Sequence, residues 1–172
     1  MGRESRNAHI KRTVLAVIVI VSCLFQFSDS FLQKFFDYPI LYTIPVIVCI
    51  SMFQGEIISM CCALVAGFFW DSVSAQSVCF NTVFLCVLAF LVSYAVQKRL
   101  RNFLITALIL NFAAVFLHVI LYWLIYVVIK SSAVGSLAAL FRFYLPSFLV
   151  TGVISIPIYF FIRFVHGKFS EM

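Results

Sequence analysis

Residues 57–70 read IISMCCALVAGFFW and residues 78–96 read VCFNTVFLCVLAFLVSYAV, with the polar segment DSVSAQS between them. A helix that crosses the hydrocarbon core of a bilayer needs about 20 mostly apolar residues. The second run has that length, and the first, although shorter, contains no charged residue. The two runs predict neighbouring membrane helices that are joined by a short polar turn.

The rest of the 172-residue chain has the same character, because 65% of its residues are hydrophobic and only 10% are charged. Soluble domains carry roughly 45–50% apolar and ~25% charged residues. The 21 phenylalanines exclude a disordered chain, since so many aromatic side chains must be buried in protein or in lipid. We therefore expect an all-α integral membrane protein.

Four further apolar runs extend the pattern in both directions along the chain. They predict a polytopic bundle of six transmembrane helices that forms one membrane domain over residues 1–172. The spans are expected at about residues 13–27, 38–53, 57–70, 78–96, 103–129 and 141–165. Pro45 lies inside the second span, where a proline removes one backbone hydrogen bond and is expected to kink the helix.

The charges are few and mostly basic, with 12 Lys and Arg against 6 Asp and Glu. They lie between the apolar runs, where they fix topology and contact anionic lipid, so nucleic-acid binding is not expected. If the N-terminus is cytoplasmic, nine basic residues fall on the inner side and three on the outer side, Lys34, Lys130 and Arg142. Cytoplasmic loops are enriched in Lys and Arg, so both termini are predicted to be cytoplasmic.

Small residues recur at every fourth position of the 57–70 run, at Ser59, Ala63 and Gly67, and Asp71 continues the row. Positions four apart share one helix face, and rows of small residues let membrane helices pack closely. The row is therefore a candidate packing surface, for a helix of this chain or for another protein. A carboxylate is unfavourable at a helix C-terminus, so Asp71 is expected to cap the turn or the next helix.

Three polar residues inside apolar runs form a second group of candidates, namely Asn81, Asn111 and His118. Asn111 and His118 are seven residues apart, which places them two turns along one helix face. Polar side chains inside lipid usually face the bundle interior. Hydrogen bonding between helices is the favoured interpretation, and a proton relay through His118 is the alternative.

No enzyme is expected, because the sequence contains no zinc-protease, hydrolase or phosphate-loop motif. The six cysteines lie in or beside apolar runs without a C-x-x-C pair, which favours inert buried thiols over a metal site. No catalytic, cofactor-binding or metal-binding residue is predicted. Trp70 and Tyr122 lie near predicted span ends, where they are expected to act as interfacial anchors.

Residues 67–74, GFFWDSVS, resemble the G-x-x-x-D-x-x-S signature of the MreD family of rod shape-determining proteins. The position of Asn81 in the following helix, the basic break at residues 98–102 and the long aromatic helix that ends near Tyr122 also fit that family. The resemblance implies a multi-pass protein of the bacterial cytoplasmic membrane with no cofactor.

The function implied by the resemblance is that of a non-enzymatic scaffold of the cell-elongation machinery. Its expected partner is an MreC-like membrane protein, with a RodA-type glycosyltransferase and a class B penicillin-binding transpeptidase in the same assembly. The family is similar in architecture to the S components of ECF-type vitamin transporters, which supplies the alternative function. S components usually carry an Ala-x-x-x-Ala docking motif on the first helix, whereas here Ile20 follows four residues after Ala16. A small transporter that uses His118 is a further alternative.

Overall fold

The computed structural model describes residues 2–27, 41–74, 79–100, 102–122, 124–125 and 145–170, with side chains in the first helix from Ile10 and in the last from Val150 to Lys168. Regular structure in these ranges is helical, without a strand. The helices are α1 (Gly2–Phe27), α3 (Thr43–Phe53), α4 (Glu56–Val73), α5 (Phe80–Lys98), α6 (Leu104–Tyr122) and α8 (Leu145–Ser170). The prediction of an all-helical, multi-pass membrane protein is confirmed.

Five of the described helices are long and apolar enough to cross a membrane, so the prediction of six spans is wrong. The exception is α3, which has 11 residues where a span over residues 38–53 was expected. A helix of this length extends for about 16 Å, roughly half of a ~30 Å hydrocarbon core. Residues 28–40, which include the start of that predicted span, lie outside the described residues.

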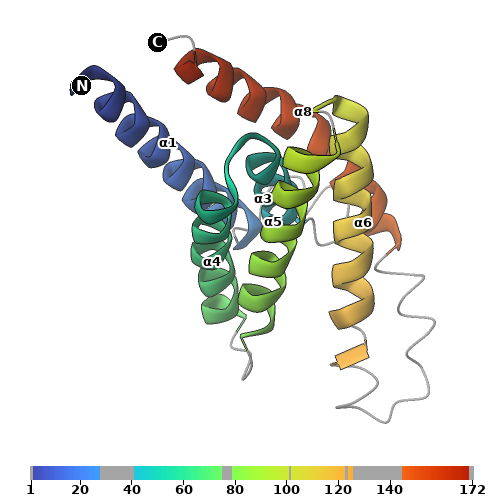
Figure 1. Ribbon diagram of the computed structural model, residues 1–172. Helices are drawn as coiled ribbons and strands as arrows, with labels where there is room; N and C mark the ends of the chain where they lie inside the picture. The colour runs from blue at the N-terminus through green and yellow to red at the C-terminus, as the bar shows by residue number, and fades with distance from the viewer. Residues whose placement is uncertain are drawn as a thin grey trace, which may run out of the picture.

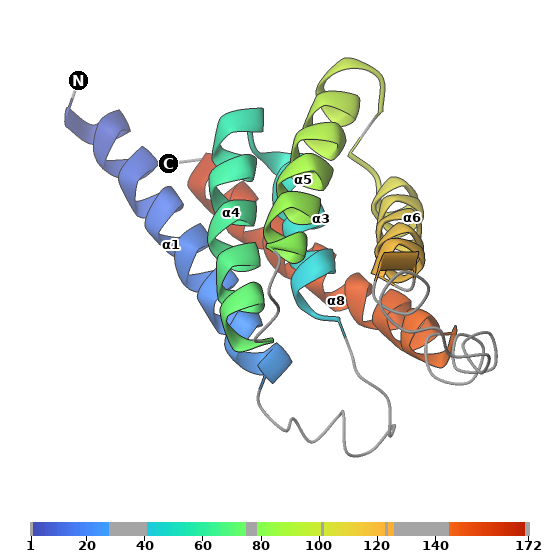
Figure 2. The ribbon, with the colours of Figure 1, turned by 90° about the horizontal axis from the view of Figure 1, so that it is seen from below.

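The short helix α3 lies in the middle of the bundle and contacts each of the other five described helices (Figures 1 and 2). Residues Thr43 to Met52 are all buried. Because protein surrounds this helix, its ends do not have to reach the membrane surface. An apolar run alone does not distinguish such an enclosed helix from a spanning one.

Pro45 was expected inside a long span, but it is the third residue of α3 and so lies in the first turn of the helix. The backbone N–H groups of the first turn of a helix have no partner within the helix. A proline in the first turn therefore removes no helical hydrogen bond. In the last helix, by contrast, Pro157 lies well inside α8.

The other helix ends also differ from the predicted spans. Helix α4 continues three residues beyond Trp70, so Asp71 lies in its last turn and not in the loop. The described part of α6 ends at Tyr122, short of the predicted 129, and residues 126–129 are outside the described ranges. Helix α8 continues five residues past the predicted end at Val165.

The N-terminal end of α1 and the C-terminal end of α8 lie at the same end of the bundle, at the top of Figure 1. The short helix α3 is the reason, because it carries the chain from the end of the bundle where α1 ends back to the end where α4 begins. Its start, Thr43, bonds to Gln26 near the end of α1, and Gln54 just after its end bonds to Ser93 near the end of α5. We call the end of the bundle that holds the start of α1 and the end of α8 the basic end, because Arg12, Lys98 and Lys168 lie toward it.

Topology reporters fused after Asn102 and at the C-terminus are therefore expected to report the same side of the membrane. A reporter inserted after Ser74, which follows the opposite end of α4, should report the other side. The measurement is the activity of paired reporters that work on opposite sides of the membrane. If the Asn102 and C-terminal fusions reported opposite sides, the direction of α3 or α8 would be wrong.

A polar cluster between α4, α5 and α6 as candidate functional site

The carboxylate of Asp71 is the centre of a buried polar cluster at the end of the bundle opposite the basic end. Only 7% of this residue is exposed. Its Oδ1 accepts hydrogen bonds from the backbone N–H of Asn81 at 3.1 Å and from the Asn81 side-chain amide at 2.9 Å. Its Oδ2 accepts bonds from the backbone N–H of Thr82 at 2.8 Å and from the Thr82 hydroxyl at 2.7 Å.

These bonds make Asp71 a capping residue for a helix to which it does not belong. Asn81 and Thr82 are the second and third residues of α5, and the residue before the helix, Cys79, gives no side-chain cap. An N-cap side chain normally accepts bonds from these same N–H groups. The carboxylate also lies at the positive end of the α5 dipole. The structure thus places Asp71 as a cap of the next helix, although it is still part of α4.

Gly67, one turn before Asp71, is a point of close backbone approach between α4 and α5. A Cβ atom added at Gly67 would lie 2.3 Å from the Cα and 2.8 Å from the backbone N of Thr82. Contacts this short involve backbone atoms, which cannot move aside as a flexible side chain can. Glycine is therefore required at position 67 to bring the two helices to this distance.

The row of small residues faces the interior of this chain. Ser59, Ala63, Gly67 and Asp71 are all buried, and α4 makes its most extensive contact with α5. The other side of α4 carries exposed apolar residues, among them Ile57, at 78% exposure. The packing partner of the row, which the sequence left open, is thus the neighbouring helix α5 (Figure 1).

Asn81 extends the cluster from α5 to α6. Its side-chain oxygen lies 2.9 Å from Nε2 of His118. A carboxylate only accepts hydrogen bonds, so the amide nitrogen of Asn81 must point at Asp71 and its oxygen at His118. It follows that Nε2 of His118 carries the hydrogen and donates it to Asn81.

Aromatic rings from three helices surround His118. Its ring centroid lies 5.1 Å from that of Trp70, 5.0 Å from that of Phe84, 5.6 Å from that of Phe80 and 6.2 Å from that of Tyr122. Trp70 is buried. It was expected to anchor the chain at the membrane interface, and that prediction is wrong, because its indole packs on His118 inside the bundle.

Asn111 does not join this cluster, although it shares a face of α6 with His118. It is buried two turns closer to the basic end, with its amide nitrogen 4.0 Å from Sγ of Cys49 in α3. Its side-chain oxygen has no hydrogen-bond partner among the described residues. The three polar residues predicted inside the membrane thus divide into a connected pair, Asn81 and His118, and a separate one.

The cluster joins α4, α5 and α6 through side chains that are hydrogen-bond partners of one another. An ionised carboxylate offers about four acceptor positions, and four donors of α5 occupy those of Asp71. Within the described residues no three His, Cys, Asp or Glu side chains gather as a metal site would require. All six cysteines are free thiols, with Cys23 and Cys49 buried and Cys61 and Cys79 exposed.

Three further polar residues have comparable roles that the sequence analysis missed. Gln26 of α1 accepts a hydrogen bond at 2.9 Å from the backbone N–H of Thr43, the first residue of α3. Thr151 of α8 accepts one at 3.3 Å from the N–H of Leu41. Ser93 of α5 donates to the carbonyl of Gln54, just after α3, at 2.9 Å. Their only sequence signal is a polar residue in or at the edge of an apolar run.

Comparison of the chain with protein-family models, with curated proteins and with solved structures finds no match.

Replacing Gly67 with alanine is expected to destabilise the protein, because the added methyl group overlaps the backbone of Thr82. Overpacking of this kind costs about 1–3 kcal/mol. The matched control is Gly55→Ala, since a Cβ at Gly55 meets no atom within 4 Å. The measurement is the thermal unfolding midpoint of the purified protein in detergent. Equal midpoints for the two variants would contradict the close approach of α4 and α5.

Replacing Asp71 with asparagine is expected to lower the unfolding midpoint as well. The amide offers one acceptor oxygen in place of two and turns an N–H₂ group toward donors of α5. Leaving buried donors unsatisfied costs about 1–3 kcal/mol. The control is Ser72→Ala, because the Ser72 hydroxyl is exposed and bonds only to the Phe68 carbonyl of its own helix. If Asp71→Asn unfolded at the same temperature as the control, the capping role of Asp71 would be refuted.

Proposed function

We propose that this chain is a non-enzymatic scaffold of the bacterial cell-elongation machinery, as its resemblance to the MreD family implies. One observation carries the proposal. The signature residues Gly67 and Asp71, together with Asn81, meet at a single junction between α4 and α5. The residues behind the resemblance therefore have a joint structural role, which is to fix the relative position of two membrane helices.

The chemistry of the cluster supports a scaffold more than a relay. Proton transfer through His118 would need a neighbour that gains or loses a proton, but its Nε2 partner is the amide of Asn81, which does not titrate in the physiological range. The polar groups of Asp71 bond to α5 of the same chain. A rigid helix pair with inward polar groups suits a protein that acts by presenting a fixed surface.

The outer faces of the helix pair offer such a surface. Phe68 of α4 and Val83 and Val87 of α5 are 63%, 62% and 53% exposed, respectively. Membrane helices associate through van der Waals packing of faces of this kind. In the proposed assembly an MreC-like partner contacts the protein there, and a RodA-type glycosyltransferase and a class B penicillin-binding transpeptidase carry out peptidoglycan synthesis.

The proposed location is the bacterial cytoplasmic membrane, with the basic end of the bundle in the cytoplasm. Arg12, Lys98, Arg99 and Lys168 lie toward that end. Lys and Arg are enriched on the cytoplasmic side of membrane proteins, which supports this orientation. Asp71 and His118 then lie near the outer surface of the membrane.

The proposal is tested by expressing the protein with an MreC-like partner in a rod-shaped bacterium that lacks its own MreD. The wild-type chain should restore rod shape and co-purify with the partner. Gly67→Leu and Asp71→Ala should insert into the membrane but lose both properties, because the α4–α5 surface is no longer held in place. His118→Gln should retain both, since a glutamine amide can still donate to Asn81.

The opposite pattern would refute the scaffold. If His118→Gln abolished function while Gly67→Leu and Asp71→Ala retained it, proton transfer through His118 would be the better explanation. Binding of a radiolabelled vitamin to the purified protein, without any effect on cell shape, would favour the S component. Insertion of each variant is checked by its yield in the membrane fraction.

A further inference from the structure

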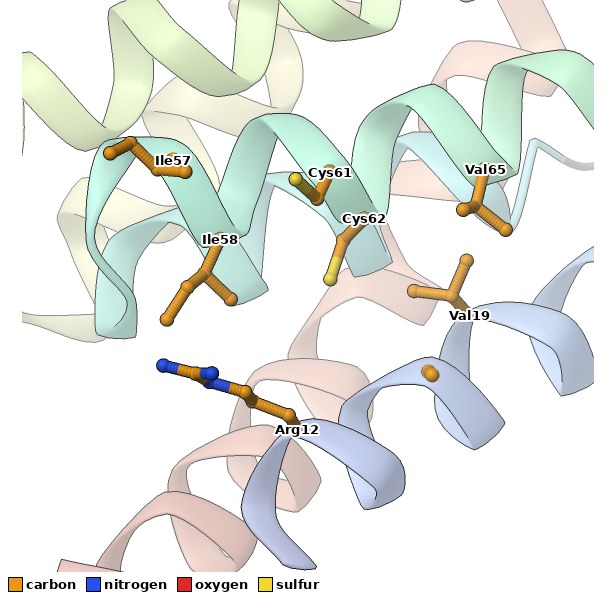
Figure 3. A pocket seen from close by; sticks show the side chains of 8 residues that line it. Arg12, Val19, Ile57, Ile58, Cys61, Cys62 and Val65 are labelled. Atoms are coloured by element: carbon orange, nitrogen blue, oxygen red, sulfur yellow. The ribbon is translucent and has the colours of Figure 1, made fainter. Parts of the chain in front are cut away.

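A groove lies between α1 and α4, away from the polar cluster. Its volume is about 380 Å³. Ala16 and Val19 line it from α1, and Cys62 and Val65 line it from α4 (Figure 3). Apart from its end at Arg12, the groove is lined by apolar side chains and by two cysteines.

Arg12 lies at the end of the groove that faces the basic end of the bundle. Figure 3 shows its side chain extending from α1 toward Ile58 at the start of α4. Arg12 is exposed and forms no ion pair with any residue whose side chain the structure describes. An arginine guanidinium pairs strongly with phosphate, through two parallel hydrogen bonds.

A second hollow continues from the groove around the start of α4. It measures about 470 Å³, and Arg12, Glu56 and Gln97 contribute polar side chains to it. Arg12, Ile57 and Ile58 line both hollows. Together the two hollows form an apolar trough that opens onto a polar rim at the start of α4.

The charge at the rim favours an anion. Arg12 is the one basic and Glu56 the one acidic residue that line the two hollows, and the positive charge in excess comes from other described basic residues toward this end. They are Lys11, Lys98, Arg99, Arg163 and Lys168. In addition, Gly55 gives α4 no side-chain cap, so the N–H groups of its first turn are directed at the rim without such a partner.

We propose that the groove between α1 and α4 binds one anionic phospholipid, with its phosphate at Arg12 and an acyl chain along Ala16, Val19 and Cys62. A helix of a partner protein fits less well. A helix is about 10 Å across with its side chains, so a volume of this size would hold only roughly one turn. A flexible acyl chain fills a narrow apolar trough, and the phosphate matches the arginine. The inference is independent of the proposed scaffold function.

The test measures binding of dioleoyl-phosphatidylglycerol to the full-length protein by native mass spectrometry, with dioleoyl-phosphatidylcholine as the zwitterionic lipid of equal chain length. Phosphatidylglycerol should bind more tightly. Arg12→Gln should weaken its binding about tenfold, as expected for the loss of a charge-assisted hydrogen bond. Arg99→Gln, which removes an exposed charge at the same end of the bundle but outside both hollows, should weaken binding much less than Arg12→Gln does.

A second pair of variants tests the apolar part of the site. Ala16→Phe should fill the groove and abolish retention of phosphatidylglycerol, whereas Val17→Phe should not, because Val17 is exposed on α1 outside the groove. Equal binding of the two lipids, equal effects of Arg12→Gln and Arg99→Gln, or full binding by Ala16→Phe would each overturn the proposal.

The cysteines supply an internal control in the wild-type chain. Cys61 lines the groove, while Cys79 is exposed at the other end of the bundle. In phosphatidylglycerol nanodiscs a bound lipid should slow alkylation of Cys61 by N-ethylmaleimide relative to phosphatidylcholine nanodiscs, and Arg12→Gln should remove that difference. Alkylation of Cys79 should be the same in all samples. A Cys61 rate that does not depend on the lipid would count against the site.

Discussion

Backbone N–H groups at the start of a buried helix need partners, and in a membrane water does not supply them. Each unsatisfied group in hydrocarbon costs several kcal/mol. In this protein the partners are side chains of neighbouring helices. Asp71 of α4 accepts hydrogen bonds from N–H groups in the first turn of α5, and Gln26 of α1 accepts one from the first residue of α3. The start of each of these helices therefore depends on the position of another helix.

The cap and the close packing at the α4–α5 junction depend on each other. Asp71 reaches the N–H groups of Asn81 and Thr82 only because the backbones of the two helices approach closely at Gly67. Residues four apart lie on one helix face, which is why a glycine and an aspartate at this spacing act on the same partner. A side chain larger than glycine would separate the helices and lengthen all four bonds to the carboxylate.

The inside of the bundle differs from its outer faces in polarity, because the polar side chains bond to one another inside it. The polar cluster of Asp71, Asn81 and His118 is turned inward and covered by aromatic rings. The outer faces of α4 and α5 are apolar and suit contact with lipid or with another membrane helix. Arg12 is an exception, because it is a charged side chain at the mouth of an apolar groove. The polar cluster lies at the C-terminal end of α4 and Arg12 lies near its N-terminal end. The packing of α4 on α5 and the proposed binding of a lipid therefore involve different parts of α4.

The sequence by itself determined the class of the protein, its helical content and the shared face of Ser59, Ala63, Gly67 and Asp71, because these follow from composition and from the helical period. It also indicated that Asp71 caps either the turn or the next helix, because a helix dipole disfavours a carboxylate at its own C-terminus. Local chemistry was sufficient for each of these.

Only the tertiary structure decided the rest. It placed α3 inside the bundle as a short enclosed helix, turned Trp70 onto His118, and separated Asn111 from the cluster of its neighbour on the same helix face. It also joined Asn81 to His118, 37 residues away in the chain. Hydropathy reports that a segment avoids water, but it does not distinguish burial in protein from burial in lipid. That distinction depends on which helices become neighbours.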